Sequence, residues 1–342
     1  MIINPMESGK NKFFKAIKLE EFDRSIEWRK KIASKQKAIA SSMLKDTDNL
    51  KCCPICELKN SKLFVVIYDH PYYECNNCGH LYLKNQPSEK SISKLYKSDD
   101  NETVKSVQEE IYIDKLLYKK RVKEISTPKA EFASKLIKGK GKWIDIGAGV
   151  GDLIFALKKM GWDSTGYESD KNEVTFAKSM GVDLINKFLT PSDLSLIKKV
   201  KVVSALNFLE HLKNPQNFVL NISNNIEVGS YFLFEVPRWP SISAVANKCF
   251  PELSSRNIYS PDHLHIFSDK SIKMMLDNSK LEIVSSWYYG QDIYELFGNV
   301  FANSNFQNHH LVDKSISIVN KLQKVVDENG LSDTALILAK KY

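Results

Sequence analysis

Apolar and polar positions along the C-terminal two thirds of the chain follow a pattern that predicts strands separated by helices. From Lys142 onward, short apolar runs alternate with amphipathic segments. The runs that we predict as strands are 143–146, 164–167, 182–185, 200–206, 231–236, 281–287 and 334–339. Seven strands that alternate with helices indicate an α/β fold with one main sheet.

The N-terminal third is organised differently. Residues 19–44 are rich in Lys and Glu and carry apolar residues at loosely helical spacing, which predicts a helix packed on another part of the chain. Short β-prone runs between cysteine pairs follow, and then a second highly charged helical pattern. We divide the chain into an N-terminal helical segment (1–50), a small cysteine module (51–87), a helical connector or active-site cover (88–130) and an α/β domain (131–342).

Composition and charge are those of a folded, soluble chain. The 342 residues include 43% hydrophobic and 26% charged residues, which argues against a disordered or fibrous protein. The 49 Lys and Arg exceed the 41 Asp and Glu by 8, an excess too modest to favour nucleic acid as the partner. No apolar run approaches the roughly 18 residues of a membrane span, and residues 1–18 lack a signal-peptide pattern. We expect a cytoplasmic protein without membrane insertion.

Five of the six cysteines fall within 27 positions, a clustering that favours metal binding over a secreted disulfide scaffold. Two C-x-x-C pairs are separated by eighteen residues, which is the spacing of a zinc ribbon. Four thiolates close a tetrahedral site, so the ion is expected to be structural. The predicted zinc ligands are Cys53, Cys56, Cys75 and Cys78. We interpret Cys52 as a bystander and Cys249 as a buried apolar residue.

A glycine-rich turn is the most informative motif. An apolar strand runs into Gly147, Gly149 and Gly151, and an apolar helix follows at once. Glycine has no Cβ and tolerates positive φ, so backbone can approach a ligand closely there. A dinucleotide site would have a third glycine of its G-x-G-x-x-G pattern at Asp152, where a carboxylate is unhelpful beside a diphosphate. Glu168 ends the next predicted strand and is placed to accept hydrogen bonds from ribose hydroxyls, so we predict an adenosine-containing ligand without phosphates.

The order of these and further motifs resembles the class I S-adenosylmethionine-dependent methyltransferases over roughly residues 130–342. Segment 202–212 resembles that family's fourth strand and Glu-His turn, segment 231–237 its fifth strand, and segment 261–268 a stretch that precedes its sixth. The resemblance implies a Rossmann-like, seven-stranded methyltransferase sheet with S-adenosyl-L-methionine as cofactor. The implied cofactor-binding residues are Asp145, Gly147, Ala148, Gly149 and Gly151, with Glu168 on the ribose and Asn207 on the sulfonium side. Taken alone, the turn is also compatible with a generic nucleotide site or a tight strand-to-helix turn.

Histidines are the candidate catalytic bases, because an acceptor hydroxyl or activated carbon must lose a proton as it attacks. In relatives that carry a zinc module and methylate deoxysugar carbons, a Glu-His pair is followed two residues later by aromatic-Phe-Ser. Asp262, His263 and 266–268 take those positions here, with Asp for Glu and Ile for the aromatic residue. We expect His263 to be the base, oriented by Asp262, with a structural role in capping the next helix as the alternative. His211 is a weaker candidate.

We expect no catalytic metal, because Asn207 stands where quinone-pathway relatives carry the first of their acidic metal ligands. The cysteine module resembles the N-terminal zinc-binding domain of sugar methyltransferases, which helps to cover the acceptor. This implies a small polar acceptor, preferably a nucleotide-linked or glycan-precursor sugar, and Arg238 is a candidate to bind its phosphate or carboxylate. An RNA methyltransferase is an alternative, disfavoured because residues 51–87 contain few basic residues and acids interrupt them. A donor-binding scaffold without activity is another alternative.

Overall fold

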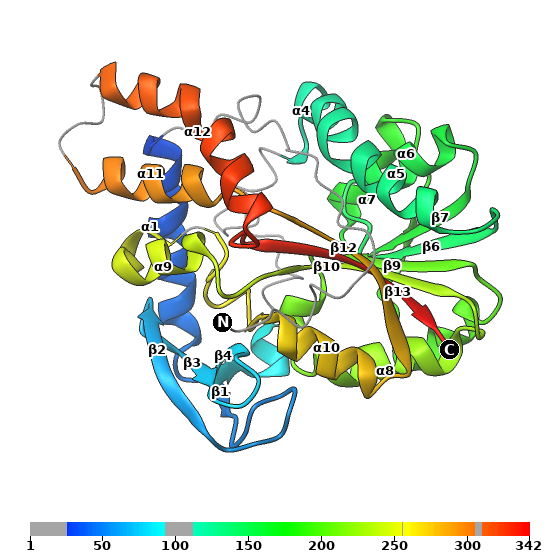
Figure 1. Ribbon diagram of the computed structural model, residues 1–342, viewed down its shortest axis with the longest axis horizontal. Coiled ribbons are helices and arrows are strands. Elements are labelled where there is room, and N and C mark those ends of the chain that lie inside the picture. The colour runs from blue at the N-terminus through cyan, green and yellow to red at the C-terminus, as the bar shows by residue number, and fades with distance from the viewer. Residues whose placement is uncertain (1–25, 93–111, 255, 305–309) are drawn as a thin grey trace.

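A seven-stranded sheet with helices on both faces forms the centre of the computed structural model, which describes residues 26–92, 112–254, 256–304 and 310–342 (Figure 1). The strand order is β12-β13-β10-β9-β6-β7-β8. The neighbours from β10 to β8 run parallel, and β13 is antiparallel to both of its neighbours. The strands are β6 (Lys142–Ile146), β7 (Asp163–Glu168), β8 (Ile185–Asn186), β9 (Val202–Leu206), β10 (Tyr231–Pro237), β12 (Leu281–Tyr289) and β13 (Thr334–Lys341).

Apolar side chains cover both faces of this sheet, as a parallel sheet buried on both sides requires. Along β6, Ile144 points to the face covered by α8 (Pro215–Asn225) and α10 (Asp269–Asp277), where Ile222 and Met275 pack. Its neighbour Trp143 points to the opposite face, against Phe132 of α5 (Thr127–Leu136) and the apolar side of α6 (Asp152–Lys159). Figure 1 shows these two helical layers on either side of the strands.

The remaining helices of the α/β part connect or extend these layers. They are α4 (Lys115–Arg121), the π-helix η2 (Val122–Ser126), α7 (Lys171–Ser179), the 3-10 helices η3 (Pro191–Ile197), η4 (Leu209–His211) and η5 (Pro251–Leu253), α9 (Ile242–Cys249), α11 (Asp292–Ala302) and α12 (His310–Glu328). Within the described ranges, the structure contains no helix that is both long and apolar enough to traverse a bilayer.

A smaller sheet joins the cysteine module to the α/β part. Its order is β11-β4-β3-β2, and its strands are β2 (Ser61–Ile67), β3 (His70–Cys75), β4 (Leu81–Leu83) and β11 (His265–Ile266). A separate two-stranded sheet pairs β1 (Thr47–Asn49) with β5 (Asn85–Pro87). Because β11 belongs to the segment before α10, this module and the α/β part share one sheet.

The predicted α/β class and its seven strands are confirmed, with one difference in position. The third strand was expected at 182–185, but β8 pairs with β7 only through Ile185 and Asn186. Val182 instead donates its backbone N–H to Ala177 and is buried behind the end of α7. The apolar run there completes a helix terminus, and the strand at this edge is short.

The predicted N-terminal helix corresponds to α1 (Ile26–Met43), and residues 1–25 of that segment lie outside the described residues. It packs beside α11, where Arg29 forms a buried ion pair with Glu295 at 2.7 Å. Residues 93–111 of the predicted connector also lie outside the described part. The described remainder is helical, and α5 continues across the division that we placed after residue 130.

Candidate functional site

The glycine turn lies where β6 leaves the sheet and α6 begins. Gly147, Gly149 and Gly151 have φ values of +71°, +54° and +75°, which L side chains adopt only with strain. At Gly147 a Cβ would also lie 2.6 Å from Cδ2 of Phe208, so that position is closed to any side chain. The turn therefore has the glycine-dependent geometry that the sequence predicted.

Glu168 lies beside this turn at the end of β7. Its Oε2 accepts a hydrogen bond from the Gly149 N–H at 2.9 Å, and its Oε1 accepts from the N–H groups of Ser169 and Asp170 at 2.6 and 2.8 Å. The carboxylate is thus held across the gap between two neighbouring strand ends. Ligands of open α/β sheets bind at this carboxyl edge.

Asp145 is buried at the end of β6 and belongs to a short hydrogen-bond chain. Trp143 Nε1 donates to Ser204 Oγ at 2.8 Å, and Ser204 donates to Asp145 Oδ1 at 2.5 Å. Burial raises the pKa of Asp145 to about 8, against the opposing effect of the Ser204 bond. The chain fixes the Asp145 carboxyl group beneath the glycine turn.

Asn207 follows β9 with a φ of +50° and contacts the neighbouring strand. Its Nδ2 donates to Glu235 Oε1 at 3.1 Å, and the other oxygen of Glu235 pairs with Lys129 Nζ at 2.6 Å. Lys129 and Glu235 are both buried, and sequence reasoning found neither of them. A charged residue inside the otherwise apolar β10 was the signal that could have revealed Glu235.

Two of the histidines that we predicted as candidate bases, His211 and His263, lie in contact with each other. The rings of His211 and His263 are 5.0 Å apart between centroids and nearly perpendicular. His211 Nδ1 donates to the carbonyl of Asp262 at 2.9 Å, and His263 Nδ1 donates to the carbonyl of Asn257 at 2.7 Å. Because each carbonyl only accepts, each neutral ring carries its proton on Nδ1 and its lone pair on Nε2.

Glu210 completes this cluster. The residue is fully buried, its Oε1 lies 3.9 Å from His211 Nε2, and no other described residue donates a hydrogen bond to either of its oxygens. Ligand atoms of Glu210, His211 and His263 all lie within 4.8 Å of one another. Burial raises the pKa of Glu210 to about 8 and lowers that of His211 to about 4 and that of His263 to about 3. Sequence reasoning singled out the Glu-His turn but gave no role to its glutamate.

The expected orientation of His263 by Asp262 remains a prediction. Asp262 contacts the histidine pair through its backbone carbonyl, which accepts a hydrogen bond from His211 Nδ1. Burial raises the pKa of the Asp262 carboxyl group to about 6. His263 itself is oriented by the Asn257 carbonyl, which lies six residues earlier in the same loop.

One family model matches the α/β part of the chain. Residues 118–286 match the family model of a methyltransferase domain. The matched region, just under half of the chain, is similar to a methyltransferase domain. The match begins in α4 and ends in β12, so it includes the glycine turn, Glu168, Asn207 and the histidine pair, and it excludes the cysteine module. A search of curated proteins finds no match.

Solved structures match parts of this chain. They include an S-adenosylmethionine-dependent methyltransferase from Archaeoglobus fulgidus, with 19% identity over 66% of this chain and 99% of that chain and a TM-score of 0.43. Geranyl diphosphate C-methyltransferase from Streptomyces coelicolor A3(2) has 14% identity over 67% and 82% and a TM-score of 0.42. Coclaurine N-methyltransferase, solved with N-methylheliamine, has 13% identity over 65% and 73% and a TM-score of 0.42.

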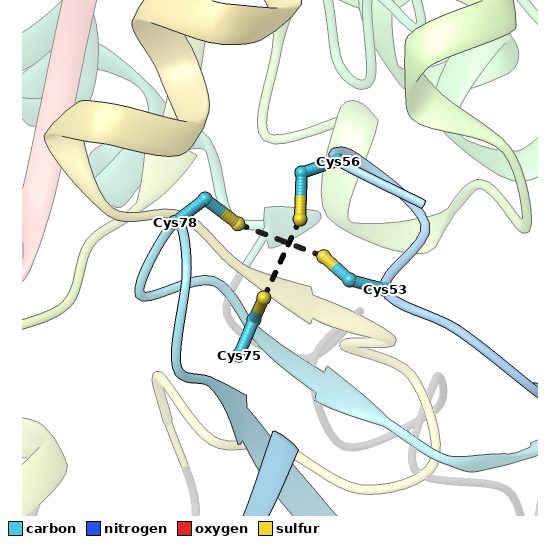
Figure 2. Close-up of side chains that lie close together, drawn as sticks. All are labelled: Cys53, Cys56, Cys75 and Cys78. Atoms are coloured by element: carbon cyan, nitrogen blue, oxygen red, sulfur yellow. Dashed lines mark hydrogen bonds between the residues drawn. The ribbon is translucent and has the colours of Figure 1, made fainter. Parts of the chain in front are cut away.

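The four cysteines predicted as ligands converge beside the α/β part. Figure 2 shows their sulfurs pointing toward one another, with Sγ–Sγ distances of 3.6 Å between Cys53 and Cys78 and 3.4 Å between Cys56 and Cys75. Sulfurs bound to one tetrahedral zinc ion at about 2.3 Å would lie about 3.8 Å apart. The donor set and its spacing therefore fit a closed zinc site. Cys249 is exposed, contrary to our expectation, because it ends α9 on the helix's outer side.

Arg238 has a structural position, which corrects its assignment as an acceptor ligand. It is 2% exposed and makes two bonds of 2.7 Å to the carboxylate of Asp269. Its remaining nitrogen donates to the carbonyls of Pro240, Gly330 and Ser332. All three guanidinium nitrogens are therefore engaged inside the α/β part.

Proposed function

We propose that the chain transfers a methyl group from S-adenosyl-L-methionine to a small polar acceptor. The observation that carries this proposal is the pairing of the glycine turn with Glu168, whose carboxylate lies against the Gly149 N–H. Such a carboxylate can exchange its backbone partners for the two hydroxyls of a ribose. Asp152 follows the turn directly, which disfavours a diphosphate and is compatible with an adenosyl ligand without phosphates.

The donor supplies a methyl group already activated by its sulfonium, so the chain's main task is alignment. Good alignment of two reacting groups contributes on the order of 7–11 kcal/mol to such reactions. We place the methionine end of the donor along Asp145, Gly147 and Ala148. We place Asn207 at the sulfonium, because its Nδ2 is committed to Glu235 and its Oδ1 retains the lone pairs that suit a cation.

The acceptor is proposed to enter beside the His211–His263 pair. His263 serves as general base through Nε2, since its Nδ1 proton is held by the Asn257 carbonyl. A base with a pKa near 3 holds an extra proton weakly, so a nearby negative charge is needed. Glu210 can supply that charge when it ionises, because its carboxyl lies within 4.8 Å of the ligand atoms of both rings.

The acceptor class is proposed to be a sugar, carried as a nucleotide conjugate or glycan precursor, on the resemblance of the cysteine module to that of sugar methyltransferases. The four cysteines are proposed to bind a structural zinc ion. β11 links this module to the loop of His263, which supports a role of the module in forming the acceptor side of the site.

The deciding experiment compares acceptors with a radiolabelled methyl donor. We expect label transfer to one or more members of a sugar-nucleotide panel and none to total RNA. Label in RNA would replace the sugar proposal with the RNA alternative. Calorimetry with S-adenosylhomocysteine and with NAD tests the donor separately, and binding of NAD alone would overturn the whole proposal.

A further inference from the structure

A buried ion pair contacts the exposed residue Asn207 at the carboxyl edge of the main sheet. Lys129 Nζ of α5 lies 2.6 Å from Glu235 Oε2 of β10, and the two residues are only 6% and 4% exposed. Asn207 directly follows β9, which pairs with β10 in parallel. Glu235 therefore lies between a buried cation and a residue at the edge where ligands of such sheets bind.

Glu235 holds Asn207 by two hydrogen bonds. The Asn207 backbone N–H donates to the Glu235 carbonyl at 3.0 Å, and its side-chain Nδ2 donates to Glu235 Oε1 at 3.1 Å. An ionised carboxylate only accepts hydrogen bonds, so the amide of Asn207 turns its nitrogen toward Glu235 and its oxygen away. The two carboxylate oxygens thus have separate tasks, because Oε1 orients Asn207 and Oε2 pairs with Lys129.

Lys129 supplies the charge that a carboxylate needs in these surroundings. The alternate residues Tyr231 and Leu233 of β10 pack in the apolar cluster on the face that α5 covers, and Glu235 continues this series. A buried carboxylate stays ionised in such a place only with a cation beside it. The ammonium also lies near the glycine turn, because its charge opposes the effect of burial that raises the pKa of Asp145.

We propose that Glu235 is a positioning residue that, with Lys129 as its counter-ion, turns the Asn207 amide oxygen toward the sulfonium of the methyl donor. This inference rests on the proposed function, which places Asn207 at the sulfonium. The oxygen end of an amide dipole attracts a nearby cation, whereas its NH2 end repels one. The arrangement therefore favours S-adenosylmethionine over its product S-adenosylhomocysteine, which lacks the methyl group and the positive charge.

The test measures the affinities for both ligands by calorimetry in wild type and in Glu235→Gln. In the variant, Lys129 claims the one oxygen of the new amide, so the NH2 faces Asn207 and the Asn207 amide must turn over. The affinity for S-adenosylmethionine should fall by about 10- to 100-fold, and that for S-adenosylhomocysteine by less than about threefold. An unchanged ratio of the two affinities would overturn the positioning role. Wild-type protein that binds neither ligand would overturn the proposed function instead.

A double-mutant cycle with Asn207→Gly shows whether Glu235 acts through Asn207. Glycine accepts the backbone φ of +50° at this position, so the substitution removes the amide without strain. Adding Glu235→Gln to Asn207→Gly should change the affinity for S-adenosylmethionine by less than about twofold. A larger further loss would mean that the unpaired charge of Lys129 repels the sulfonium directly, which would overturn the positioning role.

Two further variants test the counter-ion and the effect of losing any buried charge. Lys129→Met added to Glu235→Gln frees the amide oxygen to accept from Asn207 again, so the affinity for S-adenosylmethionine should rise by at least about threefold. No rise would overturn the role of Lys129. Glu295→Gln is the matched control, because it weakens another buried ion pair, that with Arg29. It should leave the ratio of the two affinities unchanged, and a shift like that of Glu235→Gln would overturn the proposal.

Discussion

His265 Nδ1 accepts a hydrogen bond from His80 Nε2 at 3.1 Å, across the junction between the cysteine module and the α/β part. The direction follows from the other nitrogen of His265, which donates to the carbonyl of Leu212 at 2.8 Å. Burial lowers the pKa of both histidines, so both rings are neutral. His80 follows Cys78 by two residues and Leu212 follows His211, so a continuous path joins the four-cysteine cluster to the histidine pair.

This path predicts that loss of the proposed zinc ion affects catalysis as well as stability. Cys75→Ser should reduce bound zinc from about one equivalent to none, lower the unfolding free energy by several kcal/mol and reduce turnover. Elemental analysis, urea unfolding and methyl transfer measure the three effects. Cys249→Ser is the control, because that thiol is exposed and lies outside the cluster. A zinc-free variant with wild-type stability and turnover would contradict the coupling.

Glu168→Gln tests the ribose contact without removing atoms. The amide oxygen can still accept from the Gly149 N–H, but the amide NH2 can no longer accept from the N–H groups of Ser169 and Asp170 or from a hydroxyl. We expect affinity for S-adenosylhomocysteine to fall by about tenfold or more in calorimetry. Asp163→Asn, at the exposed opposite end of β7, should leave it unchanged. Unaltered affinity in Glu168→Gln would remove this residue from the donor site.

Gly147→Ala separates the two reasons for glycine at the start of the turn. A Cβ there would meet Phe208 at 2.6 Å and would also occupy a backbone with φ of +71°. Gly139→Ala is a matched control, because Gly139 has φ of +73° and a Cβ at that position would meet nothing within 4 Å. The control should cost about 1 kcal/mol of unfolding free energy and Gly147→Ala clearly more, with loss of donor binding. Equal costs in urea unfolding would show that the steric contact is unimportant.

The sheet and the glycine turn could be predicted because their signals are local. The glycine spacing and the position of Glu168 depend on neighbouring strands, and apolar runs identify strands that are buried on both faces. Val182 was misassigned because an apolar run that closes a helix terminus looks like a short strand. Cys249 was wrongly expected to be buried, because it lies on the exposed side of α9.

Long-range contacts account for what the sequence did not reveal. Glu210 lies against His263, 53 residues later, because the Leu264 N–H donates to the Glu210 carbonyl and holds the two segments together. The pairing of Lys129 with Glu235 likewise joins a helix to a strand more than a hundred residues away. An arginine can bind an anion at the surface or form a buried ion pair, and the sequence alone does not distinguish these roles. Arg238 has the second role, because it is buried against Asp269.

His263→Asn tests the proposed base. The amide retains polarity but cannot accept a proton, so kcat should fall by about 10²- to 10⁴-fold with little change in donor affinity. Because burial lowers the pKa of His263 to about 3, this ring stays unprotonated between pH 8 and pH 5, and a loss of wild-type rate over that range would reflect protonation of Glu210, whose pKa is about 8. Stopped assays across that range check this, with His310→Asn on α12 as the control. A variant with wild-type kcat would leave His263 with a structural role.

Glu210→Gln tests the buried carboxyl group through the pH dependence of stability. The folded-state pKa of Glu210 is about 8, above its ordinary 4.5, so the folded protein keeps this proton while the unfolded chain releases it. Between about pH 4.5 and pH 8 the unfolded state therefore binds fewer protons, and this group makes the wild type less stable as pH rises. Glutamine does not titrate, so the unfolding free energy of Glu210→Gln relative to wild type should increase over that range, by up to a few kcal/mol. Urea unfolding at pH 5, 6.5 and 8 measures the difference. A constant difference would mean that the carboxyl group has an ordinary pKa, and Glu210 would then be ionised and able to compensate a proton on the histidine pair throughout the neutral range.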